Sequence, residues 1–488
     1  MDITYKPYID PEFESLIERI NPPRVCIDND TFPDCTLVKV DSANKQGMLL
    51  DMVQVLTDLD LIISKSYISS DGGWLMDVFH VIDQQGNKVT EQSLLCYIQE
   101  GICTSRRDSK GVKQNTGLEE ASQEALTGRM VLEMTGIDRP GLMSEMSAVL
   151  AGLGCHISNA VAWTHNRRVA CIIYVDDSSD HGPITDPCRV AHVQAQLENV
   201  VEAHHYKDEP RSLRLCPPAA SQTHRERRLH QIMAAEGDYE ESCSCCGGTN
   251  DDIYGYEKWR EGKSKRCNRT HVQIENCRKM GYSLVSVRSK DRPKLLFDTL
   301  CALMDLQYVV SHAAISSEGS FAIQEYYLRH KNGGTLDSEG EKRMVIRCLI
   351  AATERRASDG LRLEIRTKNR TGLLSDVSRI FRENGLSITR AEIGIRGEKA
   401  IGTFYVKDVY DDDVSPRTLE IVRREIGGTI IVGNNSPSGA SPGASFSGMR
   451  GSSTSSSGGI EEGPRLSFGS LLWAQLERLS NNFRPIKS

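Results

Sequence analysis

Four short turns carry the residues of this 488-residue chain that are best suited to bind a small charged molecule. Each turn reads Asp or Asn, Arg or Lys, any residue, Gly in three of the four, and two Leu or Met residues. The turns are 44–49, 138–143, 291–296 and 369–374. Each lies between a strand pattern and a helix pattern. Free N–H groups and a partial positive charge at a helix start favour a carboxylate, so the turns are predicted anion-binding sites.

The same turn also has a purely structural explanation. Its Asp or Asn can cap the exposed amides of the helix start. Pro140 and Pro293 suit the first helical turn, where a missing N–H costs nothing. A glycine without Cβ lets another backbone or a ligand come close. One copy would need no other explanation, whereas four copies in the same context indicate a repeated module.

The elements that position the turn are clearest around the second one. A strand is predicted at 129–134, a helix from the turn to about residue 153, strands at 155–163 and 168–177, and a helix after Pro187. A final strand is predicted at 200–206. The same order recurs around the other turns, so we number the modules copy one to copy four.

The predicted organisation alternates modules with polar segments. It comprises an N-terminal leader helix at 1–34, copy one at 35–110, copy two at 128–207, a linker with a basic helix and a Cys-rich loop at 208–280, copy three at 281–357, copy four at 360–434, and a tail at 435–488. The tail is rich in Ser and Gly and predicted disordered, apart from a short amphipathic C-terminal helix. That helix is expected to dock on the modules, with membrane-surface binding as the alternative.

Composition limits the function classes. The chain is 39% hydrophobic and 26% charged, with a net charge of −7 that gives no basic field for nucleic acid. No apolar run approaches the roughly 18 residues of a membrane span. Fifteen cysteines, mostly within apolar patterns, fit reduced thiols better than a disulfide framework. With an acidic N-terminal segment instead of a targeting peptide, a cytoplasmic protein is expected. The basic runs 225–228 and 263–266 leave a nuclear location open.

The repeated pattern resembles the ACT domain, an amino-acid-sensing module of metabolic enzymes. The segment 225–233, followed by 238–240, resembles the segment between repeats in the plant ACT-domain-repeat proteins, which have four ACT domains and no catalytic domain. The arrangement is also similar to the sensor end of bacterial uridylyltransferases. The resemblance implies an α+β fold of four ferredoxin-like βαββαβ modules, pairing into extended antiparallel sheets with helices on one face.

The resemblance also implies where a ligand is held. In amino-acid-binding ACT domains, the turn and a polar residue that opens the second strand hold the ligand between paired modules. Those strand positions are Ile62, His156, Val309 and Ser387. Only copies two and four are polar there, and copy three has Lys294 in place of the turn glycine. The predicted ligand-binding residues are therefore Asp138, Gly141, Leu142, His156, Asn369, Gly372, Leu373 and Ser387. The alternative for His156 is an ordinary histidine on the sheet surface.

No metal, cofactor or catalytic site is predicted. The chain has neither Gly-x-Gly-x-x-Gly nor the P-loop pattern, which leaves dinucleotide and P-loop chemistry without support. Cys243, Cys245 and Cys246 lack the paired spacing of zinc knuckles, so a mobile Cys-rich loop is favoured over a zinc site.

The sequence therefore favours a non-catalytic sensor that binds a free amino acid and signals to an unidentified protein partner. The alternative is an interaction scaffold without ligand binding, suggested by the hydrophobic strand openings Ile62 and Val309. An enzyme is not predicted, because no acid, base and nucleophile cluster on one module. A homodimer is left open.

Overall fold

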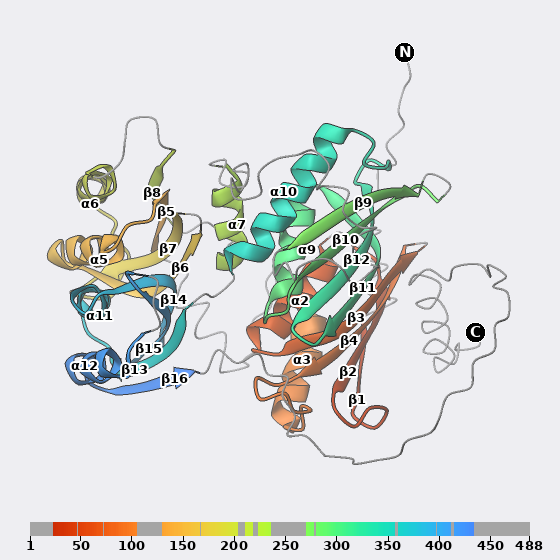
Figure 1. Ribbon diagram of the computed structural model, residues 1–488, viewed down its shortest axis with the longest axis horizontal. Helices are drawn as coiled ribbons and strands as arrows, with labels where there is room; N and C mark the ends of the chain where they lie inside the picture. The colour runs from red at the N-terminus through yellow and green to blue at the C-terminus, as the bar shows by residue number, and fades with distance from the viewer. Residues whose placement is uncertain are drawn as a thin grey trace, which may run out of the picture.

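The computed structural model contains two eight-stranded antiparallel sheets with helices packed against them (Figure 1). It describes residues 23–45, 47–71, 73–104, 129–165, 167–203, 210–217, 223–235, 270–277, 280–356, 360–396, 398–410 and 414–433. The predicted leader helix before residue 23, the Cys-rich loop and the tail with its C-terminal helix lie outside these residues. Among the described helices, none is long and apolar enough to span a membrane.

The first sheet joins copies one and three. Its strand order is β1 (Arg24–Asp28), β2 (Thr36–Ala43), β4 (Trp74–Ile82), β3 (Ile62–Asp71), β11 (Tyr308–Glu318), β12 (Phe321–His330), β10 (Tyr282–Lys290) and β9 (His271–Cys277). The two copies meet where β3 pairs with β11, around Tyr67 opposite Ala314. Helices α2 (Met48–Asp58), α3 (Gln92–Thr104), α9 (Leu295–Asp305) and α10 (Glu339–Arg355) pack against this sheet in one apolar core.

The second sheet joins copies two and four in the same way. Its order is β16 (Thr429–Gly433), β13 (Leu361–Lys368), β15 (Lys399–Asp408), β14 (Leu386–Arg396), β6 (Cys155–His165), β7 (Arg168–Asp177), β5 (Met130–Ile137) and β8 (Ser212–Cys216). β6 pairs with β14 symmetrically about Val161 opposite Glu392, so an approximate two-fold axis relates the copies. Helices α5 (Leu142–Gly152), α6 (Pro187–Glu202), α11 (Leu373–Glu383) and α12 (Pro416–Ile426) cover one face. The predicted fold class is confirmed.

The edge strands depart from the predicted element order. Copies two and four end with β8 and β16, as a βαββαβ module requires. Copies one and three instead take their edge strands, β1 and β9, from the chain that precedes them. In copy three the reason is the connection, because α10 ends at Arg355 and β13 of copy four begins at Leu361, which leaves only residues 356–360, too few for another strand and its two turns.

The described parts of the segments expected to be a leader and a linker belong to the fold. β1 lies in the predicted leader, and β8 and β9 lie in the predicted linker. The strand expected at 200–206 is wrong over its described part, because α6 continues to Glu202 and a strand forms at Ser212–Cys216 instead. Residues 204–206 lie outside the described residues. The predicted basic helix exists as α7 (Arg225–Ala235). Its Leu229, Ile232 and Met233 are buried against the uncovered face of the second sheet, where little core was expected.

All four strands that join the copies carry a β-bulge near their start. The residues that the pairing register skips at these bulges are Ser64, Ser158, Ser311 and Thr389. Each of these residues bears a hydroxyl, and in three copies it donates to the carbonyl of the neighbouring strand, over 3.2 to 3.3 Å. The hydroxyl supplies a hydrogen bond where the bulge interrupts the ladder.

Candidate functional site

The four turns share one backbone conformation at the helix start. The N-cap residues Gly47, Gly141, Lys294 and Gly372 have φ of 95°, 89°, 65° and 78°, in the left-handed region. The N-cap position is therefore taken by Gly or Lys, three residues after the Asp or Asn of the turn. The prediction that Asp or Asn caps the helix is therefore wrong. The glycine is needed for its positive φ as well as for close approach.

The backbone N–H at the Asp or Asn position of the turn makes a hydrogen bond that any residue except proline could make. The backbone N–H of Asp138 donates to the carbonyl of Arg167 over 2.7 Å, and that of Asn369 donates to Glu398 over 2.8 Å. The equivalent bond occurs in copies one and three. The residue thus ties the turn to the neighbouring hairpin, which holds the helix start in place.

An acidic residue in the first helical turn completes the repeat and was missed in the sequence. Asp51, Glu145, Asp298 and Asp376 all stand at the same distance from their turns. In copy two Arg139 pairs with Glu145, with nitrogen and oxygen 3.0 Å apart, and Arg292–Asp298 and Arg370–Asp376 are equivalent pairs. Aligning the four copies would have revealed it. A carboxylate here offsets part of the positive field of the helix start.

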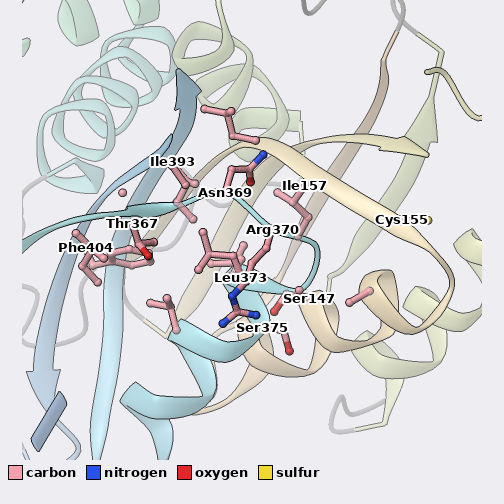
Figure 2. A pocket seen from close by; sticks show the side chains of 18 residues that line it. Ser147, Cys155, Ile157, Thr367, Asn369, Arg370, Leu373, Ser375, Ile393 and Phe404 are labelled. Carbon is pink, nitrogen blue, oxygen red and sulfur yellow. The ribbon is translucent and has the colours of Figure 1, made fainter. Parts of the chain in front are cut away.

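A cavity opens at the turn of copy four, between α5 and α11 (Figure 2). The cavity has a volume of about 40 Å³. Predicted residues Asn369, Gly372 and Leu373 line it, together with Arg370 from the same turn. The other lining residues are Ser147, Ala151, Cys155, Ile157, Ile365, Thr367, Leu374, Ser375, Val377, Ile393, Ile395, Ala400, Gly402 and Phe404. The cavity thus has a polar end at the turn and largely apolar walls contributed by both copies.

The turn of copy two is related to this one by the approximate two-fold axis but is covered. A Cβ built on Gly141 would lie 2.9 Å from Cδ of Arg382, on α11. A Cβ on Gly372 would lie 3.8 Å from Cβ of Ala151, on α5. Arg382 and Ala151 occupy equivalent places in the two copies. The long side chain of Arg382 covers the turn of copy two, whereas the methyl group of Ala151 leaves the turn of copy four open.

The structure separates the predicted site residues into two groups. Asn369, Gly372 and Leu373 meet at the cavity, and His156 joins them through its Nε2, which lies 3.2 Å from Oδ1 of Asn369. Asp138, Gly141, Leu142 and Ser387 do not line this cavity. Leu142 is buried in the core, and Ser387 stands opposite Lys407 in the ladder of β14 and β15. Burial raises the pKa of Asp138 to about 6.

His156 is buried, not an ordinary surface histidine. It is 3% exposed, and its Nδ1 lies 2.7 Å from Oδ1 of Asp176. The hydrogen bond with Asp176 raises the pKa of His156 above its usual value. Because both ring nitrogens face oxygen acceptors, the ring is fixed in orientation and holds Asn369 at the edge of the cavity.

The turn of copy three is filled by the chain itself. Glu226, on α7, accepts from Nζ of Lys294 over 2.9 Å and pairs with Arg356 over the same distance. Burial disfavours the charge of Glu226, but the charges of Arg356 and Lys294 outweigh it and hold its pKa well below the usual value. The carboxylate of Glu226 therefore occupies the turn of copy three, where the sequence predicted no ligand site.

Comparisons with known proteins agree with the repeated module. Residues 31–109 match the ACR family N-terminal ACT domain, and residues 361–427 match the ACT domain. ACT domain-containing protein ACR1 of Arabidopsis thaliana is 51% identical over 100% of both chains. ACT domain-containing protein ACR2 of the same plant is 43% identical over 99% of both.

Among solved structures, aspartate kinase from Synechocystis is 12% identical and covers 83% of this chain and 55% of its own, with a TM-score of 0.15. That similarity is too low to carry an argument. The matched domains are regulatory modules and not catalytic ones. Because these relatives match the chain over nearly its whole length, and because it has four modules, the chain belongs to the plant ACR family of ACT-domain-repeat proteins.

Proposed function

We propose that the protein is a non-catalytic sensor that binds a free amino acid in the cavity between copies two and four. The observation that carries the proposal is the open turn at Gly372, which lies at the polar end of a cavity with apolar walls. An amino acid has the matching polarity, with a charged end and a side chain that need separate environments. Pockets for small molecules typically combine apolar walls with a few placed polar groups.

The lining residues suggest how the ligand lies. The α-carboxylate approaches the first amides of α11, where the helix dipole and the guanidinium of Arg370 favour negative charge. Oδ1 of Asn369 already accepts from His156, which leaves its amide nitrogen to donate. The side chain of the ligand then lies among Ile157, Ile365 and Phe404. A small apolar amino acid is therefore favoured over a charged one.

Binding would change how copies two and four sit together. The cavity has walls from both, so a ligand favours the arrangement of α5 and α11 that fits it, and differential affinity shifts the population. A partner protein, in the cytoplasm or the nucleus, would read that shift.

Titration calorimetry of the full chain with each common amino acid tests the proposal. We expect one equivalent of a small apolar amino acid to bind. Ala151→Arg should abolish binding, because it places at Gly372 the side chain that covers Gly141. Arg382→Ala opens the second turn and should raise the stoichiometry towards two. Lack of heat for every amino acid at millimolar concentration, with the wild type folded, would overturn the proposal.

A scaffold without ligand binding is the second candidate. It is favoured by two turns that the chain covers itself, Gly141 beneath Arg382 and Lys294 against Glu226. For a scaffold, a partner captured from plant extract should be retained equally by the wild type and Ala151→Arg. Capture that depends on an added amino acid and is lost in Ala151→Arg would exclude it.

A further inference from the structure

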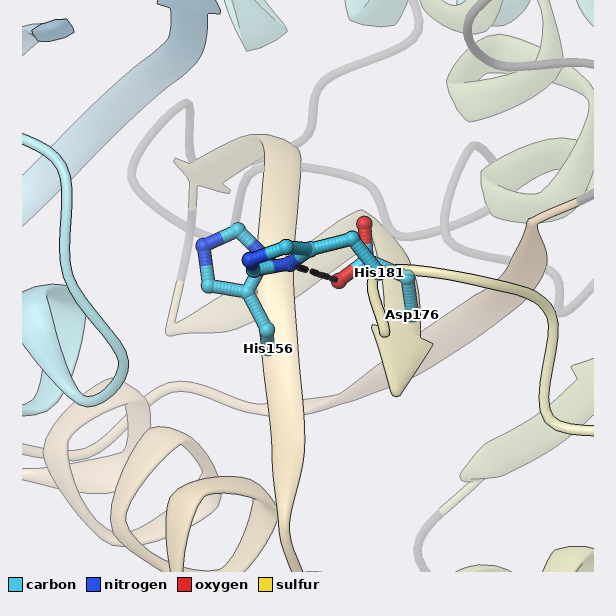
Figure 3. A group of neighbouring side chains, drawn as sticks. All are labelled: His156, Asp176 and His181. Atoms are coloured by element: carbon cyan, nitrogen blue, oxygen red, sulfur yellow. Dashed lines mark hydrogen bonds and ion pairs between the residues drawn. The ribbon is translucent and has the colours of Figure 1, made fainter. Parts of the chain in front are cut away.

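His156, Asp176 and His181 form a second cluster of polar side chains (Figure 3). His156 also contacts Asn369 of the cavity through its Nε2. His156 on β6 and Asp176 on β7 are both buried, at 3% and 0% exposure. His181 follows β7 in a loop, and its side chain is 58% exposed. One ligand atom from each of the three residues lies within 4.8 Å of the others. The approach to this cluster is therefore from the solvent side, through His181.

We infer that His156, Asp176 and His181 form a binding site for a divalent transition metal, with Zn²⁺ as the best match. Two imidazoles and one carboxylate are a ligand set that zinc accepts, with a fourth position left for water or another ligand. Nothing in the amino-acid site requires a metal, so this is a separate site with its own ligand class.

The distances suit a metal after small movements. Bonds of about 2.0–2.2 Å in a tetrahedron separate neighbouring ligand atoms by about 3.3–3.6 Å. Oδ1 of Asp176 lies 2.7 Å from Nδ1 of His156 and 3.9 Å from Nδ1 of His181. One separation is shorter than the ideal and the other longer. The longer separation can close because His181 is on an exposed loop. The shorter one, between His156 and Asp176, must open by roughly 0.6–0.9 Å as the metal replaces the proton shared by the two atoms.

The outer contacts hold two of the three ligands by their other polar atoms. Nε2 of His156 donates to Oδ1 of Asn369 over 3.2 Å, which leaves Nδ1 for the metal. Nε of Arg129 lies 3.2 Å from Oδ2 of Asp176, which leaves Oδ1. Metal-binding histidines and carboxylates in proteins are usually held in this way. The guanidinium of Arg129 repels a cation, so affinity should be lower than at a site with an unpaired carboxylate.

The backbone of His181 is a further, independent observation. Its φ is 56°, in the left-handed region that few non-glycine residues adopt, and its N–H donates to the carbonyl of Asp177 over 2.9 Å. This conformation places its ring 4.8 Å from that of His156, edge to face. Unfavourable backbone conformations persist where the surroundings impose them, often at binding sites.

The metal site would act on the amino-acid site through one side chain, and this coupling rests on the proposed function. Metal at Nδ1 of His156 keeps the proton on Nε2, which then fixes the amide of Asn369 at the cavity. Amino-acid affinity should therefore rise, by about fivefold, when metal is bound.

The test uses untagged full-length protein titrated with Zn²⁺ by calorimetry and with Co²⁺ by visible absorption. We expect one equivalent with a tetrahedral or five-coordinate Co²⁺ spectrum free of thiolate bands. His181→Ala should weaken binding at least tenfold. Because His181 is exposed, the variant should fold as the wild type does, which circular dichroism checks. His192→Ala, an exposed histidine on α6, is the matched control and should bind as the wild type does.

Equal affinity in the His181→Ala and His192→Ala variants would overturn the site. So would Co²⁺ thiolate bands that persist in His181→Ala, because they would assign the metal to cysteines. Repeating the amino-acid titration with and without Zn²⁺ separates the two proposals. Metal binding without any amino-acid heat leaves the metal site standing and removes the proposed function.

Discussion

Asp77 on β4 is a carboxyl group that folding keeps away from water. It is 1% exposed, and its Oδ1 accepts only weakly from the backbone N–H of Ser69, over 3.3 Å. Burial raises its pKa from 3.8 to about 8. The folded protein therefore holds this proton at pH values where the unfolded chain has released it.

The pH dependence of stability follows from that shift. Since the folded-state pKa is the higher one, the stability attributable to Asp77 is intact below pH 3.8 and is lost as pH rises to about 8. The slope is about 1.4 kcal/mol per pH unit between these limits. Asp77→Asn, which is neutral throughout, should gain stability over the wild type across this range in urea unfolding. Glu383→Gln, at an exposed position, is the control. A difference between wild type and Asp77→Asn that stays flat with pH would contradict the assignment.

Helix α7 acts as a bridge between the two sheets through both apolar and ionic contacts. Its apolar side packs on the second sheet beside Trp163, while Glu226 reaches Lys294 at the start of α9, on the first sheet. Arg356 pairs with both Glu226 and Asp298, and all three are at most 1% exposed. Its guanidinium also lies 4.5 Å from the ring centre of Trp163.

Removing one member of this buried network should be costly. Glu226→Ala leaves Arg356 and Lys294 without a carboxylate, and losing one partner of a buried pair typically costs about 3–5 kcal/mol. The urea midpoint should fall accordingly. Glu339→Ala removes an exposed pair with Lys342 and should leave the urea midpoint nearly unchanged. Similar midpoints for both variants would show that the network is not a major source of stability.

The sequence predicts the elements of each module well and their partners poorly. The helices after each turn and the long strands have clear hydrophobic periods, and β6 was expected at nearly its observed bounds. Edge strand β8 is short, and it is a strand only because it pairs with β5, far earlier in the chain. Edge strand β9 pairs with β10, which follows it directly, but it lies in the segment that was predicted to be a linker. Glu226 and Arg356 lie 130 positions apart, so no local pattern links them.

The candidate site shows the same limit. Asn369 and Gly372 could be named from the turn pattern alone. That Arg382 covers Gly141 while Ala151 leaves Gly372 open depends on how two copies dock, which the pattern of one copy does not contain. The bulge hydroxyls at Ser64, Ser158, Ser311 and Thr389 needed only an alignment of the four copies.

The whole molecule is two pairs of modules. A helix of the first pair, α10, packs together with α7 on the face of the second sheet that its own helices leave uncovered. Leu229 and Met233 of α7, together with Cys348 and Ala351 of α10, cover that face. The stack makes Trp163, which is 1% exposed, a reporter of the contact.

Breaking the stack should separate the halves without unfolding either. Leu229→Asp buries a charge against the second sheet and should expand the particle in small-angle scattering. Tryptophan emission should shift to longer wavelength as Trp163 meets water. Ala234→Asp, on the exposed side of α7, should leave both unchanged. Loss of far-ultraviolet circular dichroism in Leu229→Asp would mean that the halves depend on each other to fold.

The pairing of copy one with three, and of two with four, interleaves the chain between the sheets. A nick or deletion anywhere between the modules thus cannot release an intact half. A fragment that stops after β8 would contain β3 and β6 with their pairing edges bare. Bare edges recruit other strands. Such a fragment should associate with a second copy of itself or with the half that carries copies three and four. Truncated chains would therefore compete for the pairing strands of the full-length protein.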